Sequence, residues 1–114
     1  MPTIVAGSVE ISAENRDRAL SEAAQLMSDT RSEKGCRHYV WSADPTSETR
    51  IYIYEYWDNT EDFAVHLSSP YYSKMLAHMG SFAVHNVEVN KYSIDRQQPV
   101  YDPQGKARAD FFDD

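Results

Sequence analysis

Residues Arg50–Ala77 read Arg-Ile-Tyr-Ile-Tyr-Glu-Tyr-Trp-Asp-Asn-Thr-Glu-Asp-Phe-Ala-Val-His-Leu-Ser-Ser-Pro-Tyr-Tyr-Ser-Lys-Met-Leu-Ala, and this stretch decides the fold. Its first eight residues are mostly aromatic or β-branched, which is typical of a strand. A short helix follows and carries His66 on the same stripe as Phe63. The pair Ser69-Pro70 begins a second helix, because proline fits the first helical turn, where its missing N–H costs no hydrogen bond. The stretch therefore predicts a strand and two helices with one histidine facing inwards.

The remaining elements follow from the same patterns of apolar residues and turn signals. Alternating apolar residues predict strands, and i, i+3, i+4 spacing predicts a helix with a buried stripe at Leu20, Ala23, Ala24, Met27 and Thr30. The predicted elements are strand 3–11, a helix from a Ser12 cap to about Ser32, strands 36–42 and 50–57 joined as a hairpin, helix 61–67 capped by Asn59 or Thr60, a helix from Pro70 that ends at Gly80, and strand 81–94. The order β-α-β-β-α-β predicts an α+β, ferredoxin-like sandwich.

The strand at 50–57 is apolar or aromatic on both of its faces. Ile51, Ile53 and Trp57 share one parity, and three tyrosines, at 52, 54 and 56, share the other. A strand with two apolar faces needs cover on both, and helices cover only one face of this fold. We therefore expect a homodimer that packs sheet against sheet. Glu55 lies on the parity of Trp57, where an unpaired carboxylate would be costly, so we expect a partner such as Arg37 or Lys91.

The chain divides into one domain at 1–95 and a C-terminal extension at 96–114. A chain of 114 residues has the length of a single domain. The extension is rich in Gln, Pro and Asp and has no periodicity, yet it contains Val100, Tyr101, Phe111 and Phe112. Two interpretations stay open: a disordered tail, or an arm that packs on the partner subunit with its aromatic residues as anchors.

Charge and cysteine content exclude several classes of protein. The net charge is −7 and the basic residues are scattered, whereas nucleic acids and anionic membranes require a cationic face. No apolar run approaches the length of a membrane span, and the N-terminus lacks the pattern of a signal peptide. The single cysteine, Cys36, excludes an internal disulfide and is interpreted as a small buried residue, so a reducing cytoplasm is expected.

No cofactor or metal is expected from the motifs. The four glycines are too far apart for a dinucleotide fingerprint or a phosphate loop, and no Gly-x-Ser-x-Gly elbow occurs. The four histidines are His38, His66, His78 and His85, and no two of them have the i, i+2 or i, i+4 spacing that brings two histidine ligands onto one metal. A metal site assembled from residues distant in sequence stays open.

His66 has two interpretations. It is either a core histidine with its hydrogen bonds satisfied, or a base that lines a cavity between helix and sheet. Trp57 is likewise either a hydrophobic plug or a donor to an oxygen of a flat substrate. Tyr72 lies towards the same side, while His78 belongs to a neighbouring helical stripe. The sequence does not decide which face of strand 50–57 lines a cavity, so Tyr54 is an alternative to Trp57.

Three segments resemble the antibiotic biosynthesis monooxygenase family over roughly Thr3–Ile94. They are Glu-Lys-Gly-Cys at 33–36, Tyr-Ile-Tyr-Glu-Tyr-Trp at 52–57 and His-Leu-Ser-Ser-Pro-Tyr-Tyr at 66–72. The resemblance implies a dimeric α+β barrel with a pocket between sheet and helices in each subunit. The family includes cofactor-independent monooxygenases of anthrones and quinols, haem-degrading enzymes, and an isomerase of a phosphorylated signalling molecule.

The residues separate these branches in part. Haem-degrading members have an Asn on the first strand, a Trp on the second helix and a His on the following helix. Here the first strand offers Ala6, Gly7 and Ser8, His66 stands at the position of the Trp, and Leu76 stands near the position of the His, with His78 two residues away. A phosphorylated substrate would favour a basic pocket, which an acidic chain does not indicate. The resemblance thus favours a monooxygenase without cofactor that acts on a small aromatic, quinol- or anthrone-like molecule.

In that reading His66 is the catalytic base. Trp57 and Tyr72 orient the substrate, and further contacts with it are expected from Tyr54, Phe63 and His78. Two alternatives stay open: a cofactor-free isomerase of the same fold, and a non-catalytic dimer that binds a small hydrophobic molecule.

Overall fold

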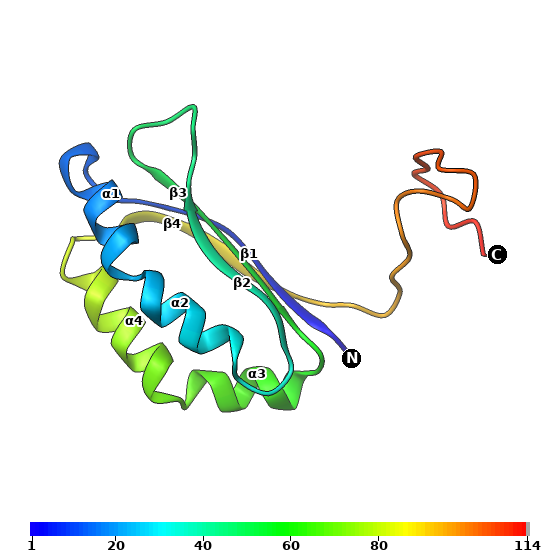
Figure 1. The fold of residues 1–114 in the computed structure, drawn as a ribbon, viewed down its shortest axis with the longest axis horizontal. Helices are drawn as coiled ribbons and strands as arrows, with labels where there is room; N and C mark the ends of the chain where they lie inside the picture. Colours follow the sequence, from blue (N-terminus) through cyan, green and yellow to red (C-terminus); the bar gives the residue numbers. More distant parts are fainter. Residues whose placement is uncertain (114) are drawn as a thin grey trace.

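The computed structural model describes residues 1–113 and shows one four-stranded sheet covered by four helices on one face (Figure 1). The last residue of the predicted extension, 114, lies outside the described residues. The elements are β1 (Thr3–Glu10), α1 (Ala13–Glu22), α2 (Ala24–Arg31), β2 (Cys36–Ala43), β3 (Arg50–Trp57), α3 (Thr60–Leu67), α4 (Pro70–Gly80) and β4 (His85–Ser93).

The sheet has the order β2-β3-β1-β4, and every neighbouring pair is antiparallel. With α1 and α2 between β1 and β2, and α3 and α4 between β3 and β4, this is the split βαβ arrangement. The predicted ferredoxin-like α+β fold is therefore confirmed. The second layer expected from a partner subunit stays a prediction.

Side-chain burial on β3 separates its two faces. Ile51, Ile53, Glu55 and Trp57 point towards the helices and are buried, whereas Tyr52 and Tyr54 are 49% and 38% exposed. The helix-facing side of the sheet packs in one core with residues of the helices, mainly Ala19, Ala23, Met27, Met75 and Met79. The alternation of residues along β3 therefore assigns Trp57, and not Tyr54, to the helix-covered side.

The first helical segment differs from its prediction. The expected single helix 12–32 is interrupted at Ala23, which separates α1 from α2, and Ser12 makes no side-chain capping bond. Ala19, Ala23, Met27 and Thr30 are buried, but Ala24 of the predicted stripe is exposed. The buried residues are spaced as on one helical face, and the stripe begins at Ala19 rather than at Leu20, which is only partly buried.

The connection between α4 and β4 also differs. Helix α4 ends at Gly80, as predicted, but β4 begins at His85 instead of position 81. Ala83 and Asn86 take positive φ values of 56° and 49°, which turn the chain sharply into the strand. Phe82 and Val84 pack against the core from this turn, so their alternation resembles a strand although the backbone is irregular.

The caps of the two C-terminal helices agree with the sequence. The Asn59 side chain accepts a hydrogen bond from the Asp62 backbone at 2.8 Å, and the Ser69 side chain accepts one from the Tyr72 backbone at 3.2 Å. Pro70 occupies the first turn of α4. These caps set where α3 and α4 begin, and thus which of their side chains face the sheet.

Gly35 brings the turn before β2 into contact with α3. Its φ is +81°, and a Cβ at this position would lie 2.2 Å from a carboxylate oxygen of Asp62. Its carbonyl accepts a hydrogen bond from the Asp58 backbone at 2.8 Å. Only glycine allows this close approach, which places Glu33 beside α3.

The C-terminal segment 94–113 stands away from the sheet and helices (Figure 1). It folds back on itself through a bridge between Tyr101 and Ala107, and Arg108 pairs with Asp110 at 2.5 Å. Near its start, the Tyr56 hydroxyl donates to the Gln97 side chain. Val100 and Tyr101 remain 58% and 63% exposed, so this segment carries exposed apolar side chains.

Candidate functional site

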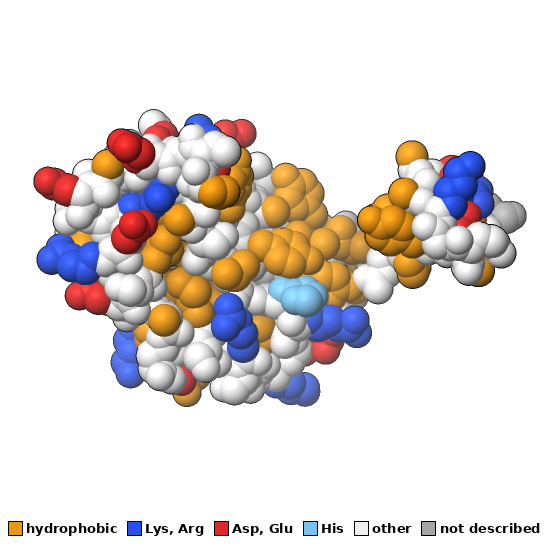
Figure 2. Space-filling view, turned by 45° about the horizontal axis from the view of Figure 1, so that its top comes forward, with side chains coloured by type: hydrophobic (Ala, Val, Ile, Leu, Met, Phe, Trp, Pro, Cys, Tyr) orange, Lys and Arg blue, Asp and Glu red, His pale blue; other side chains and the backbone are white. Residues whose placement is uncertain are grey.

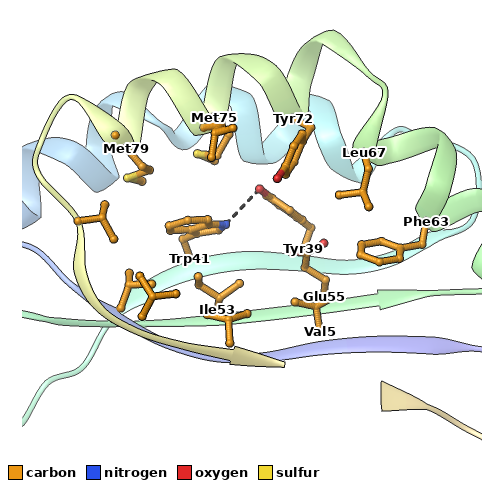
Figure 3. A pocket seen from close by; sticks show the side chains of 16 residues that line it. Val5, Tyr39, Trp41, Ile53, Glu55, Phe63, Leu67, Tyr72, Met75 and Met79 are labelled. Atoms are coloured by element: carbon orange, nitrogen blue, oxygen red, sulfur yellow. Dashed lines mark hydrogen bonds between the residues drawn. The ribbon is translucent and has the colours of Figure 1, made fainter. Parts of the chain in front are cut away.

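A cavity of about 450 Å³ lies between the inner face of the sheet and helices α3 and α4 (Figure 3). A volume of this size is at the lower end of ligand pockets and suits a small, ring-sized molecule. Most of the lining is aliphatic or aromatic. It comprises Val5, Val9, Tyr39, Trp41, Ile53, Glu55, Phe63, Leu67, Tyr72, Met75, Leu76, Met79, Gly80, Val84, Val87 and Val89.

Few polar groups reach this lining. The Trp41 indole donates to the Tyr39 hydroxyl at 3.1 Å, and the Tyr39 and Tyr72 side chains point towards each other across the cavity in Figure 3. Burial, reinforced by the charge of Glu55, raises the pKa of Tyr39 well above its ordinary value. Tyr39 therefore stays protonated at neutral pH, and its hydroxyl can donate to a ligand while it accepts from Trp41.

Glu55 is the one lining residue with an ionisable carboxyl or a charge. It is 8% exposed, and its Oε1 atom accepts a hydrogen bond from the Trp57 indole at 3.0 Å. Burial raises the pKa of Glu55, while the Trp57 hydrogen bond and the nearby His66 act in the opposite direction. The carboxyl thus lies in a weakly polar site where its affinity for a proton is higher than in water.

The expected partners of Glu55 were wrong. Arg37 pairs with Asp58 at 2.5 Å at the surface, and no bond joins Lys91 to Glu55 among the described residues. The carboxyl faces the helices, so its partners are instead the indole of Trp57, two residues further along the same face of β3, and the imidazole of His66 on α3. Glu55 and His66 come together because α3 packs on β3, and the sequence alone does not reveal this contact.

His66 is 1% exposed and lies behind Glu55 rather than on the cavity surface. Its Nδ1 atom is 2.7 Å from Glu33 Oε2, and its Nε2 atom is 3.9 Å from Glu55 Oε1. An ionised Glu33 can only accept, so Nδ1 carries a hydrogen and Nε2 is directed towards Glu55. The ring also stacks on Trp57 with centroids 4.6 Å apart. His66 is therefore a buried histidine that links two carboxyl groups.

The structure brings together four of the predicted site residues and separates two. Phe63 and Tyr72 line the cavity, and Trp57 and His66 lie directly behind its polar end. Tyr54 lies on the opposite face of the sheet, in contact with His38. His78 donates from Nε2 to the Ala19 carbonyl at 2.9 Å and packs edge-on against Phe82 at the helix interface.

Sequence reasoning missed four residues of the site. The sequence pattern places Tyr39 and Trp41 on a strand, Glu33 in a motif and Glu55 at a buried position that needs a partner, and it indicates no site for any of them. A signal was available: Tyr39 and Trp41 alternate on one face of β2, in register with Glu55 and Ile53 of β3. This signal can be used only once the register of the β2–β3 hairpin is known, because the register decides which side chains lie opposite each other.

Within residues 1–113, no group of three or more His, Cys, Asp and Glu side chains has an arrangement that would hold a metal ion. In the same part of the chain, no helix is both long enough and apolar enough to cross a bilayer.

These features define a small ferredoxin-like α+β protein with an apolar cavity between its sheet and its helices. The sequence profile of the antibiotic biosynthesis monooxygenase family matches residues 2–78. The chain belongs to that family, as the three sequence segments indicated. An uncharacterised protein from Synechocystis sp. is 23% identical over 99 residues, covering 87% of this chain and 67% of the relative.

Solved structures share the fold. A candidate antibiotic biosynthesis monooxygenase from Deinococcus radiodurans has a TM-score of 0.68 at 24% identity, covering 87% of this chain and 97% of that one. A conserved protein from Methanosarcina mazei has a TM-score of 0.72 at 16% identity, covering 81% of this chain and 91% of that one. At these identities the likeness establishes the arrangement of strands and helices and leaves the chemistry to the residues of this chain.

Proposed function

We propose that this protein is a cofactor-independent monooxygenase that oxidises a small aromatic, quinol- or anthrone-like molecule with O₂. The observation that carries the proposal is the cavity, whose polar side-chain groups are one buried carboxyl, two tyrosine hydroxyls and the Trp41 indole N–H in an otherwise apolar lining. A flat aromatic ring fits such a lining, and a single proton acceptor at one end meets the main chemical need of the reaction.

The chemistry needs little more than deprotonation and exclusion of water. A hydroquinone or the enol of an anthrone becomes electron-rich once its hydroxyl proton is removed, and the anion can reduce O₂ directly. One oxygen atom enters the ring carbon and the other leaves as water, so an anthrone plus O₂ becomes a quinone plus H₂O. The substrate supplies all four electrons. The protein supplies the base, the donors to the developing oxyanion and a dry cavity.

The residues fall into roles along the length of the cavity. Phe63, Leu67 and Met75 provide apolar contacts with the ring and exclude water. The hydroxyls of Tyr39 and Tyr72 orient the substrate oxygen. The proton acceptor belongs to the buried group formed by Glu55, His66 and Glu33.

We further propose that a second copy of the chain covers the outer face of the sheet and that the resulting homodimer works in the cytoplasm. Tyr52, Tyr54 and Tyr92 are between 38% and 49% exposed on that face. Figure 2 shows hydrophobic side chains gathered over the strands and continuing towards the C-terminal segment. A monomeric mass for the purified protein by sedimentation at micromolar concentration would contradict this assembly.

The proposed activity is tested by oxygen uptake on a panel of hydroquinones, anthrones and flavonoid-like phenols, each compared with its uncatalysed autoxidation. The variant Leu67→Trp places a large ring at the cavity wall, where Leu67 is 43% exposed and the fold can tolerate it. Val65→Trp, on the same helix, is 66% exposed and does not line the cavity, so it serves as the matched control. We expect uptake by the wild type and Val65→Trp, and loss of it in Leu67→Trp.

The same panel distinguishes the alternatives. Product formed under strict anaerobiosis would replace the monooxygenase by an isomerase that uses the same proton acceptor without O₂. A bound phenol that blocks the cavity but shows no turnover in air would identify a binding protein.

A further inference from the structure

We propose that Glu55, and not His66, takes the proton of the bound substrate, and that His66 and Glu33 form a buried support which positions Glu55 and balances its charge. This inference rests on the proposed function, because it assigns the base of that reaction. It differs from the expectation drawn from the sequence, in which the histidine itself contacts the substrate.

The first argument is access. Of the three members of the group, only Glu55 belongs to the cavity lining, whereas His66 is 1% exposed and enclosed by Trp57, Phe63 and Tyr39. A general base must come within hydrogen-bond distance of the proton that it removes. His66 cannot do so without displacing Glu55 or the aromatic rings packed on it.

The second argument is the use of the individual atoms. His66 Nδ1 is occupied by Glu33 Oε2 at 2.7 Å, and Nε2 faces Glu55 Oε1 at 3.9 Å. Within residues 1–113, the one hydrogen bond to the Glu55 carboxyl comes from Trp57 and also goes to Oε1. Both contacts therefore involve Oε1, one as a hydrogen bond from Trp57 and one as the nearby His66 ring, and within residues 1–113 Oε2 is left to meet a ligand.

The third argument is charge. An isolated carboxylate in an apolar cavity is costly, and it would be protonated and unable to act as a base. His66 provides a nearby ring that can carry a positive charge, and Glu33 on its far side stabilises that charge. His66, 3.9 Å from Glu55 Oε1, lowers the pKa of Glu55 and so favours the carboxylate form that can accept the substrate proton.

The proposed step is a single proton transfer. The O–H bond of the hydroquinone or enol breaks, an O–H bond forms at Glu55 Oε2, and the electron pair stays on the substrate oxygen. Tyr72 and Tyr39 are the donors to that oxygen. When the product leaves, the proton returns to water from Glu55.

The pH dependence of the reaction follows from the groups around Glu55. These are His66 from α3, Glu33 from the turn before β2, Cys36 and Tyr39 from β2, and Trp57 on the same strand. Burial raises the pKa of Glu55 and the charge of Glu33 acts in the same direction, whereas Trp57 and His66 lower it. The value of kcat/KM should therefore rise with pH through a midpoint above the ordinary carboxyl value, and removal of His66 should move that midpoint upwards.

The test compares Glu55→Gln, His66→Gln and the surface control Glu14→Gln, using the substrate with the largest oxygen uptake in the panel. We expect Glu55→Gln to lose about 10²- to 10⁴-fold in kcat, the usual contribution of a general base, with KM changed by less than about threefold. His66→Gln should lose only about tenfold in kcat and shift the acid limb of kcat/KM to higher pH. Equal losses in the two variants without that shift, or a larger loss in His66→Gln, would overturn the assignment.

A second readout keeps the inference separate from the proposed activity. The carboxyl ¹³C resonance of Glu55, assigned by comparison with Glu55→Gln, is titrated with pH without and with hydroquinone under anaerobic conditions. We expect its midpoint to move on binding in the wild type and not in Leu67→Trp. An unmoved midpoint with hydroquinone bound would refute the contact, even if the wild type consumes oxygen. A moved midpoint without oxygen uptake would refute the monooxygenase and retain the contact.

Discussion

Both faces of β3 are rich in apolar or aromatic side chains, but the two faces have different environments. On the inner face, Ile51, Ile53 and Trp57 are at most 5% exposed and surround one buried carboxyl, Glu55. On the outer face, Tyr52 and Tyr54 stand half exposed in the chain as described, without a covering layer. The comparison shows that hydrophobicity alone does not identify a ligand site. The inner face is identified as the candidate ligand site by the Glu55 carboxyl. This carboxyl is buried and accepts a hydrogen bond, yet it lines the cavity on one side.

The largest expected effect tests the packing of the inner face. Trp57→Ala removes a fully buried indole, its stack on His66 and the hydrogen bond to Glu55, so it should lower the free energy of unfolding by about 3–5 kcal/mol. Tyr54→Ala on the outer face is the comparison, and urea denaturation of both proteins below the concentration at which copies associate measures the difference. Equal losses would mean that the two faces are covered to the same extent.

A second prediction concerns the turn that holds Glu33 beside His66. Gly35→Ala requires a side chain at φ +81°, and its Cβ would collide with Asp62, so we expect a loss of about 2–4 kcal/mol. Gly105→Ala is the matched control, because φ there is +79° but nothing lies within 4 Å of the added Cβ. Thermal unfolding of the two variants separates the collision from the backbone strain, and similar losses would assign the whole effect to strain.

A third prediction follows from the raised pKa of Glu55. The folded protein binds this proton more tightly than the unfolded chain does, so the stabilisation is complete below the ordinary carboxyl pKa of 4.5 and is lost as pH rises through the folded pKa. The slope cannot exceed about 1.4 kcal/mol per pH unit for one proton. The urea midpoint of the wild type minus that of Glu55→Gln should decrease as the pH rises above 4.5. The other carboxyl groups contribute equally to both proteins, so their effects cancel in this difference. A rising difference would place the Glu55 pKa below its ordinary value.

The smallest expected effect concerns the cap of α3, the helix that carries His66 and Phe63 into the inner side. Asn59→Ala removes the side-chain acceptor for the Asp62 backbone and should cost about 1 kcal/mol, with Asn59→Gly costing only a few tenths. Chemical denaturation of the two variants tests this order. A loss of activity by Asn59→Ala under conditions in which the variant is still fully folded would show that the cap also positions His66.

Much of this architecture was predictable because it depends on local pattern. The alternation of Arg50–Trp57, the pair Ser69-Pro70 and the turn signals around them predict the order of elements. Ser69 caps α4, and Asn59, one of the two predicted candidates, caps α3. The break at Ala23 and the turn at Ala83 were not predicted. Each is a backbone adjustment to packing between layers, and the residues there carry no turn signal of their own.

For the site, the sequence by itself determined which side chains are available: one histidine on an apolar helical stripe, a tryptophan and a glutamate on one strand face, and tyrosines nearby. Only the tertiary structure decided their roles. The residues Glu33, Glu55 and His66 are far apart in the chain, and they meet because a glycine turn, a strand and a helix converge behind one cavity. Which group reaches a ligand depends on which atom remains uncovered after packing, and that is a property of the whole fold rather than of any segment.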